Sequence, residues 1–228
     1  DAVKFQSFTA SEIAVQNLKY NRIKNKFKKF SNNLYDFYQK FELPENFNLK
    51  IHNYCKKKKI IFMTSIFGDH SLKIAKKLSP IIKIASFESN YFELFEKLIK
   101  IKKPIIISTG CSSEKDILKI KNFFKKKKYK NFSILHCGSS YPLKLNQVDL
   151  RYIKKLKKIF PNNLIGYSDH TKNISTCIAA VALGAKIIEK HITISRNDGA
   201  PDSFFSLEEN DLKKMVDGIR EVELSLGV

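Results

Sequence analysis

The stretch LIGYSDHTKNISTCIAAVALGAKIIEKH, residues 164–191, holds two short apolar segments separated by a helical pattern. Residues 173–183 carry apolar side chains at the three-to-four spacing of an amphipathic helix. The segments on either side end in polar, chemically capable residues, Ser168-Asp169-His170 and Glu189-Lys190-His191. A strand, a helix and a second strand in this order predict a parallel pair of strands joined by a crossover helix.

The same alternation extends over the rest of the chain. Short runs rich in β-branched and aromatic residues predict buried strands at residues 2–5, 60–63, 81–84, 104–107, 133–135, 164–167 and 187–188. Helical periodicity covers residues 45–56, 69–78, 91–102, 113–126, 148–159, 173–183 and 207–226. The sequence therefore predicts an α/β fold whose parallel sheet is either open and doubly wound or closed as a (β/α)8 barrel.

Polar residues at the end of almost every predicted strand favour the closed TIM barrel, because only a barrel aims all of those ends at one pocket. They are Lys4 and Gln6, Thr64 and Ser65, Lys83, Ser86 and Glu88, Ser108 and Thr109, His136 and Ser139, Ser168 and His170, and Glu189 and His191. We expect one barrel domain over residues 1–228, with seven strand and helix units. The chain starts inside a strand at Asp1 and ends in a helix at Val228, so we also expect a first strand upstream and a fragment of a longer protein.

Composition restricts the class of protein. A chain of 228 residues is long enough for one sizeable core. It contains no apolar run of membrane-spanning length and does not begin with a signal-peptide pattern, so we expect a soluble cytoplasmic protein without a membrane partner. The cysteines are scattered and are expected to be reduced, small buried residues: Cys55, Cys111, Cys137 and Cys177.

The net charge of +20 raises the possibility of a nucleic-acid-binding protein. The excess is nearly all lysine, in runs such as residues 56–59 and 125–128 just before predicted strands. We interpret these runs as solvated lysines on exposed loops and expect no nucleic-acid partner. The alternative, a basic nucleic-acid-binding protein, predicts binding that falls steeply with salt.

The two strand-end histidines suggest a metal site. Side chains alternate along a strand, so Ser168 shares a face with His170, and Glu189 shares a face with His191. If the two strands are neighbours, both imidazoles meet, and two histidines with open positions suit a catalytic divalent metal. The alternative is that each histidine is a hydrogen-bonded core or rim residue. Glu189 is expected to orient the surroundings of His191 or to act as an acid or base; the alternative is a buried partner for a lysine such as Lys4 or Lys83.

Lysines within apolar strands need a partner or a ligand. Lys4 and Lys83 are both flanked by apolar residues. One interpretation is a Schiff-base lysine, as in an aldolase. We favour a phosphate or carboxylate clamp. Hydroxyl donors lie at other strand ends and would complete it: Thr64, Ser86, Ser108 and Ser168.

The chain resembles the sialic acid synthases, which join phosphoenolpyruvate to an N-acetylated hexose. The resemblance runs in order along nearly the whole chain. It is carried by DAVKFQ at 1–6, KIASFE at 83–88, ISTG at 107–110, LHC at 135–137, SYP at 140–142, GYSDHT at 166–171, AVALGA at 180–185, EKH at 189–191 and PD at 201–202. The implied product is a nine-carbon 2-keto sugar acid, released with phosphate.

The resemblance also implies roles for individual residues. His170 and His191 would hold a manganese or magnesium ion. Gln6, Glu88 and Glu189 are our candidates for the catalytic groups. The expected substrate-binding residues are Lys4, Thr64, Lys83, Ser86, Ser108, Ser139, Tyr141, Ser168 and Asp202.

Two segments, 83–88 and 195–202, are most similar to those of pseudaminic acid synthases, with N-acetylneuraminate and legionaminate synthases as alternatives. Ile66 replaces a usual proline and Ser139 a frequent asparagine. The resemblance implies a homodimer in which an antifreeze-like C-terminal domain supplies an arginine, and an upstream strand that supplies a glutamate. We expect both to be missing from this chain and the chain by itself to be inactive or barely active, although the full-length protein is expected to be a synthase.

Overall fold

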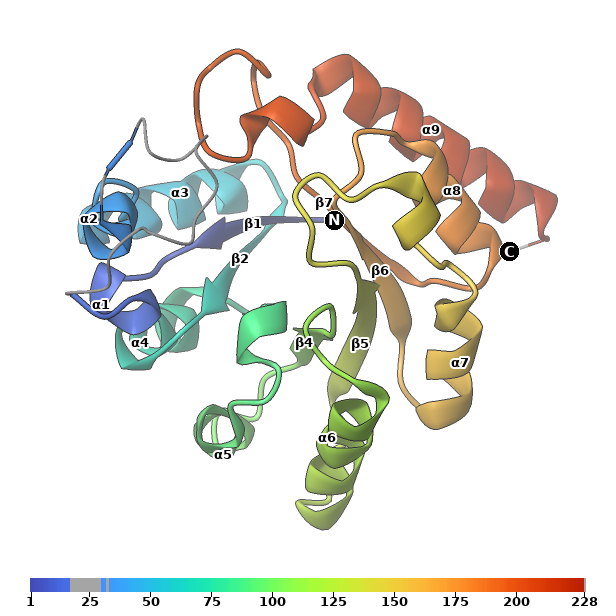
Figure 1. Cartoon of the computed structure of the whole chain (residues 1–228), viewed down its shortest axis with the longest axis horizontal. Coiled ribbons are helices and arrows are strands. Elements are labelled where there is room, and N and C mark those ends of the chain that lie inside the picture. Colours follow the sequence, from blue (N-terminus) through green and yellow to red (C-terminus); the bar gives the residue numbers. More distant parts are fainter. Residues whose placement is uncertain (17–29, 32, 228) are drawn as a thin grey trace. The chain divides into compact units, whose positions relative to one another are not determined.

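The computed structural model describes residues 1–16, 30–31 and 33–227. It forms two compact units, Asp1–Ile105 and Ile106–Val228, and we describe each by itself. The strands follow one another in chain order, from β1 to β7, and the pairs with an established register are all parallel. The predicted parallel α/β sheet is therefore confirmed (Figure 1).

The first unit alternates strands and helices as predicted. Its strands are β1 (Ala2–Gln6), β2 (Ile61–Ile66) and β3 (Ile82–Ile84), and its longer helices are α3 (Glu45–Lys57), α4 (Asp69–Leu78) and α5 (Phe92–Ile99). A short 3-10 helix, η2 (Ser86–Glu88), follows β3. Two further helices, α1 (Ala10–Ile13) and α2 (Leu34–Gln39), were not predicted, because elements this short carry too little apolar periodicity.

The second unit continues the same order. Its strands are β4 (Ile105–Ser108), β5 (Phe132–Cys137), β6 (Ile165–Asp169) and β7 (Ile187–Lys190), and its helices are α6 (Glu114–Lys126), α7 (Tyr152–Ile159), α8 (Ser175–Ala182) and α9 (Glu209–Ser225). The 3-10 helices η3 (Leu145–Gln147) and η4 (Ser203–Phe205) precede α7 and α9. Figure 1 shows α8 and α9 packed side by side.

Every predicted strand and every predicted helix is present, but several ends differ. Helix α7 was predicted to start at residue 148 and starts at Tyr152. The intervening Asp149 has a positive φ of 41°, which an α-helix does not accommodate. Helix α5 ends at Ile99, three residues before the predicted end. The single barrel domain, its closure and the additional first strand remain predictions.

The lysine runs 56–59 and 125–128 are exposed, as expected. Lys59 and Lys128 adopt the left-handed conformation, with φ of 57° and 53°, and each lies two residues after the end of a helix, α3 or α6. Of the cysteines, Cys55, Cys137 and Cys177 are buried and all four thiols are free. Cys111 is exposed, so its predicted burial was wrong; it lies in the turn after β4, outside the packed sheet. None of the described helices is long and apolar enough to cross a membrane.

Candidate active site

The strand register of the first unit places three predicted site residues in one row. Gln6 pairs with Ser65, and Ser65 pairs with Lys83, so the three side chains share one face of the sheet. Lys4, two residues before Gln6, lies on that face as well. Lys83 is 1% exposed and its Nζ donates to the carbonyl of Ile84 at 2.7 Å. A buried ammonium in such a row is suited to binding an anion.

Thr64, a predicted substrate-binding residue, does not belong to this row. Its register partners are Phe5 and Ile82, which lie on the opposite face. Its hydroxyl donates to Ser7 Oγ at 2.8 Å, and Ser7 donates to Asn48 of α3. Two adjacent hydroxyl residues lie near the end of β2, and a shift of one residue along a strand reverses the face on which a side chain lies. The hydroxyl in the row is that of Ser65, which is buried and has no hydrogen-bond partner among the described residues.

Glu88 and Ser86 follow β3 in η2. Ser86 is buried, and Oε2 of Glu88 is inaccessible and lacks a hydrogen-bond partner among the described residues. Burial raises the pKa of the Glu88 carboxyl to about 7, although a backbone hydrogen bond and the charge of Lys83 both act to lower it. Glu88 is therefore able to exchange a proton near neutral pH.

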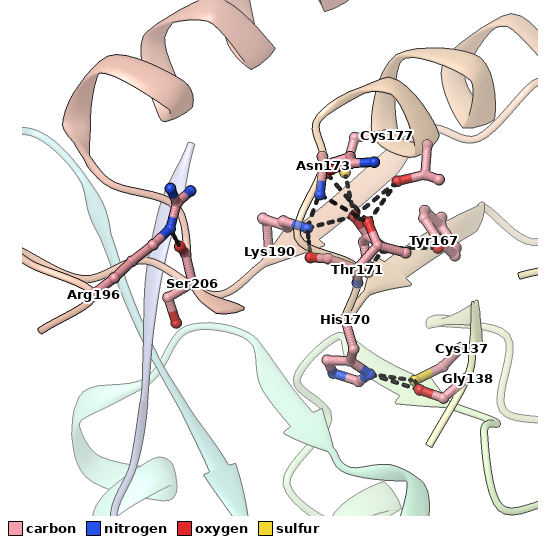
Figure 2. Close-up of polar contacts among 12 residues, drawn as sticks. Cys137, Gly138, Tyr167, His170, Thr171, Asn173, Cys177, Lys190, Arg196 and Ser206 are labelled. Carbon is pink, nitrogen blue, oxygen red and sulfur yellow. Dashed lines mark hydrogen bonds and ion pairs between the residues drawn. The ribbon is translucent and has the colours of Figure 1, made fainter. Parts of the chain in front are cut away.

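In the second unit, neighbouring strands bring the two histidines together. Strand β6 ends at Asp169, next to His170, and β7 ends at Lys190, next to His191. Their ring centroids lie 5.3 Å apart. Nδ1 of His170 donates to the carbonyl of Gly138 at 2.7 Å (Figure 2). Since this bond fixes the proton on Nδ1, the lone pair of His170 lies on Nε2.

Three further residues surround the imidazoles. Nδ1 of His191 lies 3.7 Å from Oδ2 of Asp202. The ring of Tyr141 lies 4.3 Å from the His170 ring, between centroids, and the ring of Phe205 lies 5.1 Å from the His191 ring. Burial, with smaller contributions from nearby acidic groups, raises the pKa of Tyr141 well above its usual value. Tyr141 therefore keeps its proton and can act as a hydrogen-bond donor.

Ser168 and Glu189 are register partners, one residue before the Asp169 and Lys190 pair. Ser168 Oγ donates to Glu189 Oε1 at 2.7 Å. This bond orients a carboxylate on the face of the sheet that leads to His170 and His191. Ser168 is thus an observed partner of the Glu189 carboxylate.

The remaining predicted residues lie at strand ends or just after them. Ser108 is buried at the end of β4. Ser139, two residues after β5, accepts a hydrogen bond from the Cys111 thiol. His136 belongs to the core instead, with Nε2 donating to the Val148 carbonyl at 2.6 Å, and burial lowers its pKa.

The histidine pair fits a divalent metal as a two-ligand site. Two imidazoles stand close together, and the tautomer of His170 leaves Nε2 for a metal. Within the part of the chain that the structure describes, no group of three or more His, Cys, Asp and Glu side chains is arranged to hold a metal. Water and substrate oxygens would complete such a coordination sphere.

Sequence reasoning missed one residue of the polar row and the residues that hold the histidine pair. In the polar row, only the strand register distinguishes the Ser65 hydroxyl from that of Thr64. The carbonyl of Gly138 has no sequence signature. Asp169 and Lys190, which precede the two histidines, form a buried ion pair at 2.6 Å that the sequence does not reveal.

Polar and imidazole groups at the carboxyl ends of parallel strands are the usual arrangement of an active site in α/β folds. Comparison with known proteins identifies the family of the chain, because residues 1–228 match the NeuB family. The chain therefore belongs to the NeuB family.

Among its relatives is the pseudaminic acid synthase of Campylobacter jejuni, which is 34% identical over 228 residues, covering 100% of this chain and 66% of the relative. The N,N'-diacetyllegionaminic acid synthase of the same species is 35% identical over 230 residues, covering 100% of this chain and 69% of that protein. The crystal structure of an N-acetylneuraminic acid (sialic acid) synthetase from Leptospira borgpetersenii superposes with a TM-score of 0.86 at 32% identity, covering 100% and 74% of the two chains. The chain thus spans about two thirds of the length of these curated relatives.

Proposed function

We propose that this chain is the catalytic part of a phosphoenolpyruvate-dependent synthase of the sialic acid type. In the proposed reaction, C3 of phosphoenolpyruvate forms a carbon–carbon bond with the aldehyde of an open-chain N-acetylated amino sugar. Water adds at C2 of the phosphoenolpyruvate unit, and phosphate leaves with cleavage of the C–O bond. The products are a nine-carbon 2-keto sugar acid and inorganic phosphate.

The histidine pair is the observation that carries the proposal. His170 and His191 lie at adjacent strand ends with 5.3 Å between ring centroids, and the proton of His170 is fixed on Nδ1. We assign both imidazoles to a manganese or magnesium ion, which would polarise the sugar aldehyde when bound. The Asp202 carboxylate lies 3.7 Å from Nδ1 of His191, beyond hydrogen-bond distance, and keeps its proposed role in substrate binding.

The polar row of the first unit is suited to phosphoenolpyruvate, which carries a carboxylate and a phosphate. Lys83 supplies a buried positive charge and Ser65 a buried hydroxyl without a partner among the described residues. Lys4, Gln6 and Ser86 lie in or beside this row and keep their proposed roles. Ser65 replaces Thr64 in the proposal. Ser108, Ser139 and Ser168 remain proposed substrate-binding residues on the resemblance to the family.

Two groups are suited to moving or holding protons. Glu88, with a pKa of about 7, is present in both protonation states at neutral pH and is our candidate for proton transfer. Tyr141 remains protonated and offers its hydroxyl to a sugar oxygen. Glu189, held by Ser168, is our candidate for orienting the water that adds at C2.

The segments at 83–88 and 195–202 support pseudaminic acid as the product class. Arg196 fixes the second segment, because its Nε donates to the Ser206 carbonyl at 2.9 Å and its guanidinium pairs with Asp211 (Figure 2). Thr193 donates to Asp198 at 2.6 Å and secures the same segment. An ordered segment that ends at Asp202 beside His191 is a reasonable determinant of sugar choice.

The test is phosphate release from phosphoenolpyruvate by the full-length protein. 6-Deoxy-AltdiNAc and N-acetylmannosamine are compared as acceptors, with manganese and then with excess chelator. Metal-dependent release with the first sugar supports the pseudaminate assignment, and release with the second alone moves the assignment to neuraminate. His170→Ala is the inactive control.

Absence of release with either sugar contradicts the proposed reaction. An aldolase using Lys83 or Lys4 is distinguished in the same assay. A Schiff base would be trapped by borohydride with a keto substrate and would not need a metal.

A further inference from the structure

A buried ion pair links the ends of β6 and β7 directly beside the two histidines. Asp169 immediately precedes His170, Lys190 immediately precedes His191, and the two are register partners in the sheet. Their side chains point to the face opposite Ser168 and Glu189, because neighbouring residues of a strand alternate. Oδ2 of Asp169 accepts from Nζ of Lys190 at 2.6 Å, and the two side chains are 0% and 2% exposed.

Both Asp169 oxygens are fully used. Oδ1 accepts from the Tyr167 hydroxyl at 2.8 Å and from the Thr171 backbone at 3.0 Å. Oδ2 accepts from the hydroxyls of Thr171 and Thr176, at 3.0 and 2.9 Å, and from the Cys177 thiol at 3.4 Å. Thr176 and Cys177 belong to α8, so the carboxylate joins the strand end to the helix that follows it (Figure 2).

Lys190 forms hydrogen bonds with the segment that follows His170. Besides Asp169, its ammonium donates to the carbonyl of Thr171 and to that of Asn173, the latter at 3.1 Å. All three protons of the ammonium therefore have acceptors. His170 lies between Asp169 and Thr171, which are both held by the residue before His191. The position of one imidazole is thus coupled to that of the other through a single buried side chain.

Stability alone is a weak explanation for this pair. Removing two charges from water is costly, and well-packed apolar residues of similar volume often replace a buried ion pair without loss of stability. Apolar residues would not reproduce the directional hydrogen bonds. These bonds attach the carbonyls of residues 171 and 173 to Lys190 of β7. A metal site needs this precision, since small displacements of its ligands weaken binding.

We propose that Asp169 and Lys190 are positioning residues that set the distance and orientation between His170 and His191 for a divalent cation. The proposal rests on the metal site of the proposed function. Neither residue touches the cation. Each acts through the backbone of the histidine that follows it.

The first test compares manganese binding by the full-length protein and by the double variant Asp169→Leu/Lys190→Met. Affinity is measured by electron paramagnetic resonance of free manganese, without any substrate. We expect the double variant to bind manganese 10- to 100-fold more weakly, as is usual when residues that orient metal ligands are removed. Urea unfolding of both proteins is measured in parallel.

A matched control separates positioning from general destabilisation. Ile120→Ala removes a fully buried side chain from α6, outside the histidine cluster, and is expected to lower stability without changing manganese affinity. Unchanged manganese affinity in the Asp169→Leu/Lys190→Met variant would overturn the proposal. So would an equal loss of affinity in Ile120→Ala.

A second measurement needs no metal. Nitrogen-15 spectra of histidine-labelled protein report the tautomer of each imidazole, and His170 is assigned with a His170→Asn variant. The wild-type protein is expected to show a single tautomer with the proton on Nδ1, because of the bond to Gly138. The double variant is expected to show a mixture.

If the wild-type protein binds no manganese, the proposed metal site fails, and these spectra then decide the positioning role by themselves. A single, unchanged tautomer in the double variant would contradict that role.

Discussion

Each unit of the chain buries a lysine near a carboxylate, and the two pairs behave in opposite ways. In the first unit, burial raises the pKa of Glu88 to about 7 and outweighs the charge of Lys83. In the second unit, burial also acts to raise the pKa of Asp169, but the charge and hydrogen bond of Lys190 and the other donors outweigh it and lower the pKa. The same two residue types thus give a titratable acid in one unit and a permanent anion in the other.

The difference follows from how many donors each carboxylate has. Asp169 accepts from six donors, including Lys190, and forms a closed network. Glu88 retains a buried oxygen without a hydrogen-bond partner in the described parts of the chain, and Ser65 retains such a hydroxyl. Buried polar atoms without partners are costly and are typical of sites that await a ligand. The carboxylate of the second unit is therefore fixed by its hydrogen bonds, whereas the first unit contains two buried oxygen atoms without hydrogen-bond partners among the described residues.

The largest expected effect is on stability, from removing each lysine in turn. Lys190→Met leaves Asp169 as a buried, uncompensated anion and should lower the free energy of unfolding by about 3–5 kcal/mol. Lys83→Met should cost less than about 2 kcal/mol, because Glu88 can become neutral by binding a proton near pH 7. Urea unfolding of both variants at pH 6.5 measures the difference. Equal losses would show that the two pairs are alike.

Much of the fold follows from periodicity in the sequence. The run from Ile82 to Ile84 and the apolar spacing of α6 identify a buried strand and an amphipathic helix without tertiary information. Helices α1 and α2 were missed because they are too short to show apolar periodicity, and α1 also depends on contacts far away in sequence. Glu12 of α1, for example, accepts hydrogen bonds from the backbone of His70 and Ser71 at the start of α4. Periodicity carries no information about such contacts.

The part of the candidate site that could be predicted is the part identified by residue type alone. Two histidines after successive strands were recognised, and the structure brings their rings together. Strand register decides between Thr64 and Ser65, and a local apolar run does not specify register. Asp169 and Lys190 were passed over because a charged residue in sequence looks the same whether it is exposed or buried in a network. Only burial distinguishes the two.

A smaller effect is expected on the pH dependence of the free energy of unfolding, and it tests whether Glu88 titrates near neutral pH. Its pKa rises from 4.5 in the unfolded reference to about 7 in the folded protein, so the wild type is most stable below pH 4.5 with respect to this group. That stability is lost as the pH rises through 7, because the folded state then has to bury a charge. We expect a loss of about 1–3 kcal/mol between pH 5 and pH 8, which Glu88→Gln should abolish.

Unfolding measured across that pH range gives the slope directly. Glu93→Gln, at an exposed position on α5, is the matched control and should follow the wild type. If Glu88→Gln retains the wild-type slope, the carboxyl of Glu88 is not the titrating group.

The smallest expected effect concerns a feature that the two units share. Helices α3 and α6 both end in a Schellman motif, in which Ile60 N donates to Cys55 O and Tyr129 N donates to Phe124 O, both at 3.0 Å. The left-handed position in these motifs is a lysine, Lys59 or Lys128, with φ of 57° and 53°.

Helix α8 ends in the same way, with Ala185 N donating to Ala180 O at 2.9 Å, but it has Gly184 at φ 97°. A side chain in this conformation clashes with its own backbone, whereas glycine does not. Lys59→Gly and Lys128→Gly should therefore each raise the free energy of unfolding by about 0.5–1 kcal/mol, and Gly184→Lys should lower it by a similar amount. Thermal unfolding measures all three. Because the motif is local, the two gains should be equal in the two units, and a gain confined to one would mean that the lysine of the other stabilises its unit through contacts beyond the helix end.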